Sequence, residues 1–232
     1  MTVWESRSLP GDSFFLGTVV ITSAFWFFAL LHSTLVSHRF QRLVESQFGR
    51  VPTLAFYRLA FTLINGVVLS ILSLIILTIP DRNLYSTFGG LYWALRSVQI
   101  VGFVLLLFSA RGVDLLKFVG LRQALYFLLH KEAFEELHPV REEGLDTSGM
   151  YGVVRHPMYL SVLVMMWATP AMSLIYLSLA LNVTLYFYVG SYLEERRLVA
   201  RFGQEYVRYQ EQVSRLFPWR WLLALPREEI LR

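Results

Sequence analysis

The sequence predicts an all-α integral membrane protein with about five transmembrane helices, the last two of which form a helical hairpin. Of its 232 residues, 55% are hydrophobic and only 16% are charged, whereas soluble domains are about one-quarter charged. Long uncharged runs recur from residue 13 to residue 193, so we expect a single membrane domain over residues 1–232. The absence of cysteine excludes disulfides, thiolate metal sites and a cysteine nucleophile.

Three runs in the N-terminal half are long enough to cross a bilayer. A spanning helix needs about 20 apolar residues because all of its backbone hydrogen bonds must be made internally. Residues 13–37 and 59–79 contain no Asp, Glu, Lys or Arg, and residues 88–110 contain only Arg96. We therefore expect three spans within residues 13–110.

A fourth uncharged run covers residues 157–193. As one helix it would be about 55 Å long at 1.5 Å per residue, well beyond the roughly 30 Å hydrocarbon core of a bilayer. Pro170 lies near its middle, and proline interrupts a helix because it lacks an amide hydrogen and clashes with the preceding turn. The run therefore predicts a helical hairpin.

The number of Lys and Arg residues alternates between low and high from one connecting segment to the next. Four lie between the first two spans and one between the second and third; six lie in residues 111–155, and eight follow from Arg196 onward. Cytoplasmic segments are enriched in these residues. We expect the N-terminus outside and the C-terminus in the cytoplasm, in a bacterial inner membrane. The basic residues form no continuous stripe, so nucleic acid is not an expected partner.

Three segments are expected at the cytoplasmic face. Residues 111–130 mix apolar and charged positions, which fits either a helix at the membrane interface or an extension of the third span. Residues 131–147 are polar and acidic and contain Pro139, which predicts a loop. In residues 198–213 apolar side chains recur at helical spacing against charged ones, which predicts an amphipathic C-terminal helix that ends before Pro218.

Two polar clusters flank the expected hairpin. The sequence Y-G-V-V-R-H-P-M-Y over residues 151–159 enters it, and E-E-R-R over residues 194–197 leaves it. Both ends of a hairpin lie at the same membrane face. The two clusters should therefore meet and form a polar pocket at the cytoplasmic boundary of the membrane.

These residues resemble a known family. The pattern G-x-Y-x-x-x-R-H-P-x-Y from Gly149, the Glu-Glu pair, and F-G-x-E-Y-x-x-Y-x-x-x-V-x-R-x-x-P from Phe202 are similar to the isoprenylcysteine carboxyl methyltransferase and phospholipid methyltransferase group. The resemblance covers residues 149–218. It implies that the C-terminal half, residues 111–232, binds S-adenosylmethionine at the cytoplasmic face.

The resemblance also implies which residues contact the cofactor. They are Tyr151, Gly152, Val154, His156, Pro157, Tyr159, Leu160, Glu194 and Glu195. One departure is Ser161, which stands where the family commonly has glycine and is expected to line the pocket.

Methyl transfer from a sulfonium cofactor requires few catalytic groups from the protein. A sulfonium methyl group is already a strong electrophile, so the site mainly has to align the acceptor and exclude water. No metal is required. We expect Arg155 or Arg196 to orient an anionic group of the acceptor, which is a small or lipophilic molecule. Membrane lipids are the other expected partner.

The N-terminal half resembles the NnrU-like proteins, some of which are thiol S-methyltransferases. This similarity rests on His32-Ser33 near the end of the first span and on Tyr57-Arg58 after a basic segment. It favours a thiol as the acceptor and implies a catalytic role for His32. Related carotene isomerases bind haem, so a haem protein with His32 and His156 as iron ligands is an alternative. A membrane scaffold without enzymatic activity is a third.

Overall fold

The computed structural model describes residues 11–111, 114–130, 134 and 144–224. The described residues are predominantly helical, which confirms the all-α prediction. They fall into two compact units, each considered below by itself. The first unit comprises residues 1–84, 113–141 and 173–179, and the second comprises residues 85–112, 142–172 and 180–232.

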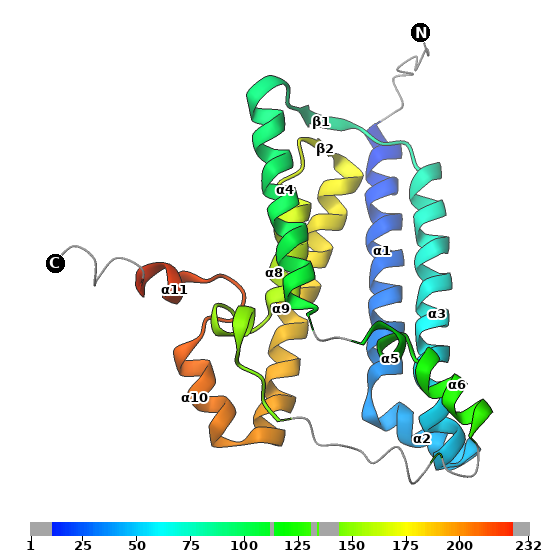
Figure 1. The fold of residues 1–232 in the computed structure, drawn as a ribbon. Coiled ribbons are helices and arrows are strands. Elements are labelled where there is room, and N and C mark those ends of the chain that lie inside the picture. The colour runs from blue at the N-terminus through cyan, green and yellow to red at the C-terminus, as the bar shows by residue number, and fades with distance from the viewer. Residues whose placement is uncertain (1–10, 112–113, 131–133, 135–143, 225–232) are drawn as a thin grey trace, which may run out of the picture. The chain divides into compact units, whose positions relative to one another are not determined.

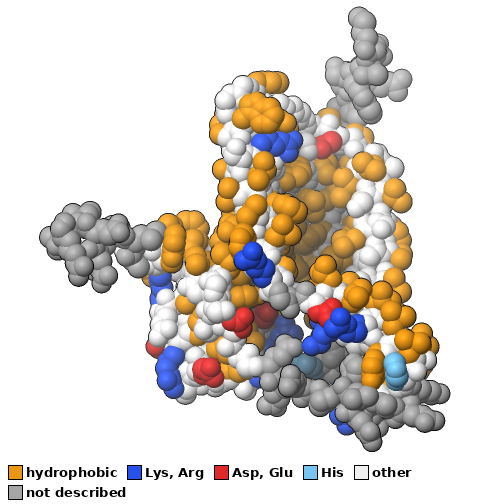
Figure 2. Space-filling view, viewed as in Figure 1, with side chains coloured by type: hydrophobic (Ala, Val, Ile, Leu, Met, Phe, Trp, Pro, Cys, Tyr) orange, Lys and Arg blue, Asp and Glu red, His pale blue; other side chains and the backbone are white. Residues whose placement is uncertain are grey.

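Four helices in the described part are long and apolar enough to cross a membrane. They are α1 (Gly11–Val36), α3 (Arg50–Thr78), α4 (Gly89–Ser109) and α9 (Leu174–Phe202). Hydrophobic side chains are numerous on the face of the molecule shown in Figure 2, and Leu77 on α3 is 80% exposed. A surface of this kind suits lipid rather than water, so the chain is a multi-pass membrane protein.

In the first unit, α1 and α3 run side by side (Figure 1). The connection between them is itself a helix, α2 (His38–Phe48), which the sequence analysis did not predict. The Ser37 hydroxyl caps it by accepting a hydrogen bond from the Phe40 amide. Gly49 then turns the chain into α3 at φ +85°, a backbone conformation that favours glycine.

The interfacial helix predicted over residues 111–130 is divided in two. The structure has α5 (Leu115–Val119) and α6 (Leu121–Leu129), separated by Gly120 at φ +87°. A Cβ atom at Gly120 would overlap the backbone of Leu59, so this turn lies directly against α3. The prediction of one helix was wrong because it overlooked this glycine.

In the second unit, α4 packs along α8 (Pro157–Trp167). The packing is close, since a Cβ atom at Gly102 would lie 2.8 Å from Met165 Cγ and 3.2 Å from Ser161 O. At 11 residues, α8 is about 16 Å long, too short to cross a bilayer as a helix. Five helices were predicted to cross, and within the described residues four have the necessary length.

The hairpin is interrupted at the predicted place, around Pro170. Strands β1 (Asn83–Ser86) and β2 (Ala171–Ser173) form a short two-stranded sheet. Within the second unit, the Thr87 amide donates to Pro170 O at 2.8 Å. The turn of the hairpin is therefore hydrogen-bonded to the residues that precede α4.

The C-terminal part of the chain also differs from the prediction. Helix α9 continues to Phe202, where Gly203 at φ +58° ends it, and a separate helix, α10 (Gln204–Gln212), follows. The amphipathic helix predicted over residues 198–213 is therefore two helices. A last short helix, α11 (Trp219–Ala224), comes after Pro218. Most of the loop predicted over residues 131–147 lies outside the described residues.

Candidate active site

A buried carboxylate, Glu195 on α9, lies at the centre of a polar cluster in the second unit. Its side chain is 2% exposed. Oε1 accepts from Arg155 Nε at 2.8 Å and lies 3.1 Å from His156 Nε2. Oε2 accepts from Arg155 Nη2 at 3.1 Å, Gln210 Nε2 at 2.9 Å and Arg215 Nε at 3.2 Å. A buried charge must be paired and hydrogen-bonded, and Glu195 meets this requirement.

The Arg155 side chain is buried in the same cluster and bonds to protein groups there. Its side chain is 7% exposed, and Nη1 donates to Gln210 O at 2.9 Å and to Val213 O. The Arg155 backbone amide donates to Ser214 O at 2.9 Å. Arg155 therefore joins the entrance of α8 to the chain after α10, and its guanidinium group is directed at other protein groups.

The neighbouring carboxylate, Glu194, lies in a different environment. Its side chain is 42% exposed. Among the described residues it contacts Tyr159, whose hydroxyl donates to Oε2 at 3.0 Å, and His156, whose Nδ1 lies 3.6 Å away. The Tyr159 ring stacks between His156 and Phe187, with centroid distances of 5.3 and 4.4 Å. The Glu194 carboxylate is therefore accessible to water, and the tyrosine that donates to it is held by ring stacking.

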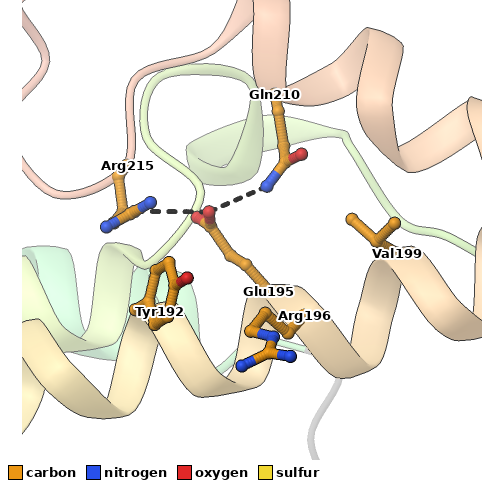
Figure 3. A pocket seen from close by; sticks show the side chains of 6 residues that line it. All are labelled: Tyr192, Glu195, Arg196, Val199, Gln210 and Arg215. Carbon is orange, nitrogen blue, oxygen red and sulfur yellow. Dashed lines mark hydrogen bonds and ion pairs between the residues drawn. The ribbon is translucent and has the colours of Figure 1, made fainter.

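A cavity of about 300 Å³ opens beside Glu195 (Figure 3). Its lining residues are Tyr192, Glu195, Arg196, Val199, Gln210 and Arg215. Arg196 is exposed, and within the described part of the chain it has no ion pair. The cavity therefore combines a buried carboxylate with guanidinium groups, one of which is available to a ligand.

Among the residues predicted to bind the cofactor, only Glu195 lines the cavity. Val154 is fully buried and pairs with Ser214 in an isolated parallel bridge. Pro157 is the first residue of α8, and Ser161 is 1% exposed with its hydroxyl donated to Pro157 O. Nine residues with a predicted place in the pocket do not line this cavity: Tyr151, Gly152, Val154, His156, Pro157, Tyr159, Leu160, Ser161 and Glu194. Their proposed contact with the cofactor stays a prediction.

Four lining residues were given no role from the sequence: Tyr192, Val199, Gln210 and Arg215. Arg215 is a fixed position of the quoted C-terminal pattern, so a signal for it existed. Gln210 occupies a variable position of that pattern, and only the packing of α10 identifies it.

His32 belongs to the first unit. Its Nδ1 lies 3.1 Å from Asn65 Oδ1, and its ring contacts Phe28 and Phe61. The other proposed haem ligand, His156, directs Nε2 at Glu195 and Nδ1 at Glu194. Both ring nitrogens of His156 therefore face carboxylates, which disfavours His156 as a ligand of haem iron.

Tyr209 on α10 holds the backbone just before Arg155 in place. Its burial predicts that the stability of the protein depends on pH. Its hydroxyl donates to Tyr151 O at 2.6 Å, and burial raises the pKa of Tyr209 to about 12. The folded state thus favours the neutral phenol. Its contribution to the free energy of unfolding is complete below about pH 10, the unfolded value, and is lost as the pH rises through about 12.

We therefore expect the melting temperature in detergent to fall between about pH 10 and pH 12. Tyr209→Phe should be less stable than the wild type at neutral pH by about 1 kcal/mol, the contribution of one hydrogen bond. Its melting temperature should also fall less steeply at alkaline pH. Tyr188→Phe, at a 59% exposed position, is the control. Parallel pH curves for Tyr209→Phe and the wild type would contradict the assignment.

The chain is similar to several curated bacterial proteins. It is 40% identical to methanethiol S-methyltransferase 1 of Bradyrhizobium diazoefficiens over 126 residues, which is 54% of this chain but only 42% of that relative. It is 31% identical to methanethiol S-methyltransferase 2 of the same organism over 191 residues, covering 82% of this chain and 69% of the relative. It is 30% identical to methanethiol S-methyltransferase of Pseudomonas deceptionensis over 216 residues, covering 90% and 76%. No family model matches the chain, and no solved structure matches it.

Proposed function

The chain belongs to the methanethiol S-methyltransferase family of membrane proteins, and we propose that it transfers the methyl group of S-adenosylmethionine to a small thiol. The observation that carries this proposal is the cavity beside Glu195, with its lining of both charge signs. An apolar membrane protein has little structural reason to gather so many charged groups at one place, because their desolvation is costly.

The cavity lining fits the cofactor chemically. S-adenosylmethionine carries a carboxylate as well as an ammonium and a sulfonium group, so it needs partners of both signs. We propose that Arg196 pairs with the carboxylate of the cofactor. We propose that Glu194, which lies outside the cavity lining but has an exposed carboxylate beside Tyr159, pairs with the ammonium group.

The assignment of Arg196 differs from the expectation that it orients the acceptor. A small thiol such as methanethiol has no carboxylate or phosphate that an arginine fork could hold. The cofactor does have a carboxylate. Arg155 is excluded from either task by its bonds to Glu195, Gln210 and Val213, and we assign it a positioning role.

In this mechanism the protein acts mainly by positioning. When bound, S-adenosylmethionine supplies an electrophilic methyl group. Glu195 holds Arg155 and His156 in place, and Tyr159 and His156 fix the orientation of the Glu194 carboxylate. Holding two reactants in line and excluding water accounts for large rate factors without a covalent intermediate. The thiolate form of a thiol is a good nucleophile, so the acceptor needs little help from a base.

We propose the membrane orientation predicted from the arginine distribution. The C-terminal end of α9, with Glu194 and the basic residues that follow it, would face the cytoplasm of a bacterial cell. S-adenosylmethionine is made in the cytoplasm, so this orientation gives it access to the cavity. The names of the relatives, all methanethiol S-methyltransferases, further support a thiol acceptor.

The test is a methyl-transfer assay on purified protein in detergent. With methyl-labelled S-adenosylmethionine and methanethiol, we expect labelled dimethyl sulfide, S-adenosylhomocysteine and a proton as products. Methanol and methylamine are matched acceptors that lack sulfur and should give no product. Cofactor binding without product from any thiol would disprove the proposed acceptor class, and no binding of S-adenosylhomocysteine would disprove the proposed cofactor.

A further inference from the structure

A second cavity lies within the first unit, where α2 packs against α3 and the end of α1. Its volume is about 370 Å³. Helix α2 contributes Phe40, Val44 and Phe48, which lie on one face of the helix at intervals of four residues. Helix α3 contributes residues from Pro52 to Ile64. These side chains have no part in the site around Glu195, which lies in the second unit.

The cavity offers no free polar group to a ligand. Hydroxyl groups line it at Thr53 and Tyr57, but both are donated to the backbone. Thr53 Oγ1 donates to Gly49 O at 2.7 Å, and Tyr57 OH donates to Leu35 O. A cavity of this kind stays dry and accepts hydrocarbon, so the part of the occupant that enters it is apolar.

The cavity is also elongated. Its lining on α3 extends from Pro52 to Ile64, which is about 18 Å along the helix axis at 1.5 Å per residue. Phe48 is 71% exposed and Ile64 is 42% exposed, so the cavity reaches the surface of the unit near both ends. This shape suits a flexible hydrocarbon chain lying along α3.

Positive charge gathers on α2 and at the start of α3, the two segments that border this cavity. Residues 38–50 contain Arg39, Arg42 and Arg50, and their only acidic residue is Glu45. The three arginines are exposed. At 3.6 residues per turn, Arg39 and Arg42 lie on the side of α2 opposite to its cavity-lining residues. An amphiphile whose chain lies in the cavity would meet hydrocarbon there, and the long arginine side chains could reach round α2 to its headgroup.

We propose that this cavity binds an acyl chain of an anionic phospholipid whose phosphate group lies among the arginines of α2 and the start of α3. Basic residues beside a membrane span attract anionic headgroups, and the apolar lining accommodates the chain. The site is separate from methyl transfer and does not depend on it. The lipid would stabilise the junction of α1, α2 and α3, since a ligand that binds only the folded state stabilises it.

Native mass spectrometry of the delipidated protein tests this proposal with two probes of equal chain length, dioleoyl phosphatidylglycerol and dioleoyl phosphatidylcholine. We expect the first to be retained and the second to bind at least about fivefold more weakly, since each nearby arginine contributes about 1 kcal/mol to anionic lipid binding. Ala60→Trp places a large ring in the cavity and should abolish retention. Leu63→Trp, on the same helix but outside the lining, should not.

A second variant tests the charge without filling the cavity. Arg39→Gln combined with Arg42→Gln changes only exposed positions and should lower phosphatidylglycerol retention by about tenfold or more. Arg82→Gln is the matched control elsewhere in the first unit. Equal retention of both lipids, or retention unaffected by the double substitution, would overturn the proposal. Equal loss in Ala60→Trp and Leu63→Trp would do the same.

Discussion

Replacing Glu195 by alanine should destabilise the second unit by about 3–5 kcal/mol and abolish cofactor binding. The reason is that removal of one partner leaves a buried charge uncompensated, here the 7% exposed side chain of Arg155. Gln210 and Arg215 would lose their acceptor as well. Thermal unfolding in detergent and calorimetric titration with S-adenosylhomocysteine measure the two effects.

The amide variant Glu195→Gln sharpens this test, because it keeps the shape of the side chain but removes its charge. We expect it to fold, with a lower melting temperature than the wild type and with weakened cofactor binding. Glu211→Ala on α10 removes a carboxylate at an exposed position and should change neither quantity. A Glu195→Ala variant as stable as the wild type would contradict the central role assigned to this carboxylate.

The fold could largely be predicted from the lengths of its apolar runs. A bilayer allows few alternatives to helices of about 20 residues, so residues 13–37, 59–79 and 88–110 correspond to α1, the apolar part of α3, and α4. The amphipathic helix α2 was missed although Phe40, Val44 and Phe48 have helical spacing. Three apolar positions at this spacing among eleven residues are a weak signal, and four charged or histidine side chains share the same segment.

The site could be predicted in part. A hairpin brings its two ends to one membrane face, and the structure brings Arg155 and His156 together with Glu194 and Glu195. The sequence could not distinguish the two glutamates. Adjacent residues on a helix point about 100° apart, and only the packing of α10 and the chain after it decides which one is buried. The same packing decides that Arg155 is internal and that Arg196 lines the cavity.

The distinction between the two arginines leads to the second prediction. Arg196→Ala should weaken binding of S-adenosylhomocysteine by about 10- to 100-fold, since hydrogen bonds to charged groups contribute about 1.5–3 kcal/mol. The melting temperature should not change, because Arg196 is exposed and has no ion pair among the described residues. Arg155→Ala should show the opposite pattern, with a large loss of stability.

The kinetic constants of Arg196→Ala identify the ligand that this arginine meets. If it pairs with the carboxylate of the cofactor, the KM for S-adenosylmethionine rises and the KM for methanethiol does not. Arg196→Lys should recover part of the affinity, because it restores the charge but not the planar fork. Arg208→Ala, at an exposed position on α10, serves as the control. A rise in the KM for the thiol alone would contradict this assignment and return Arg196 to the role of orienting the acceptor.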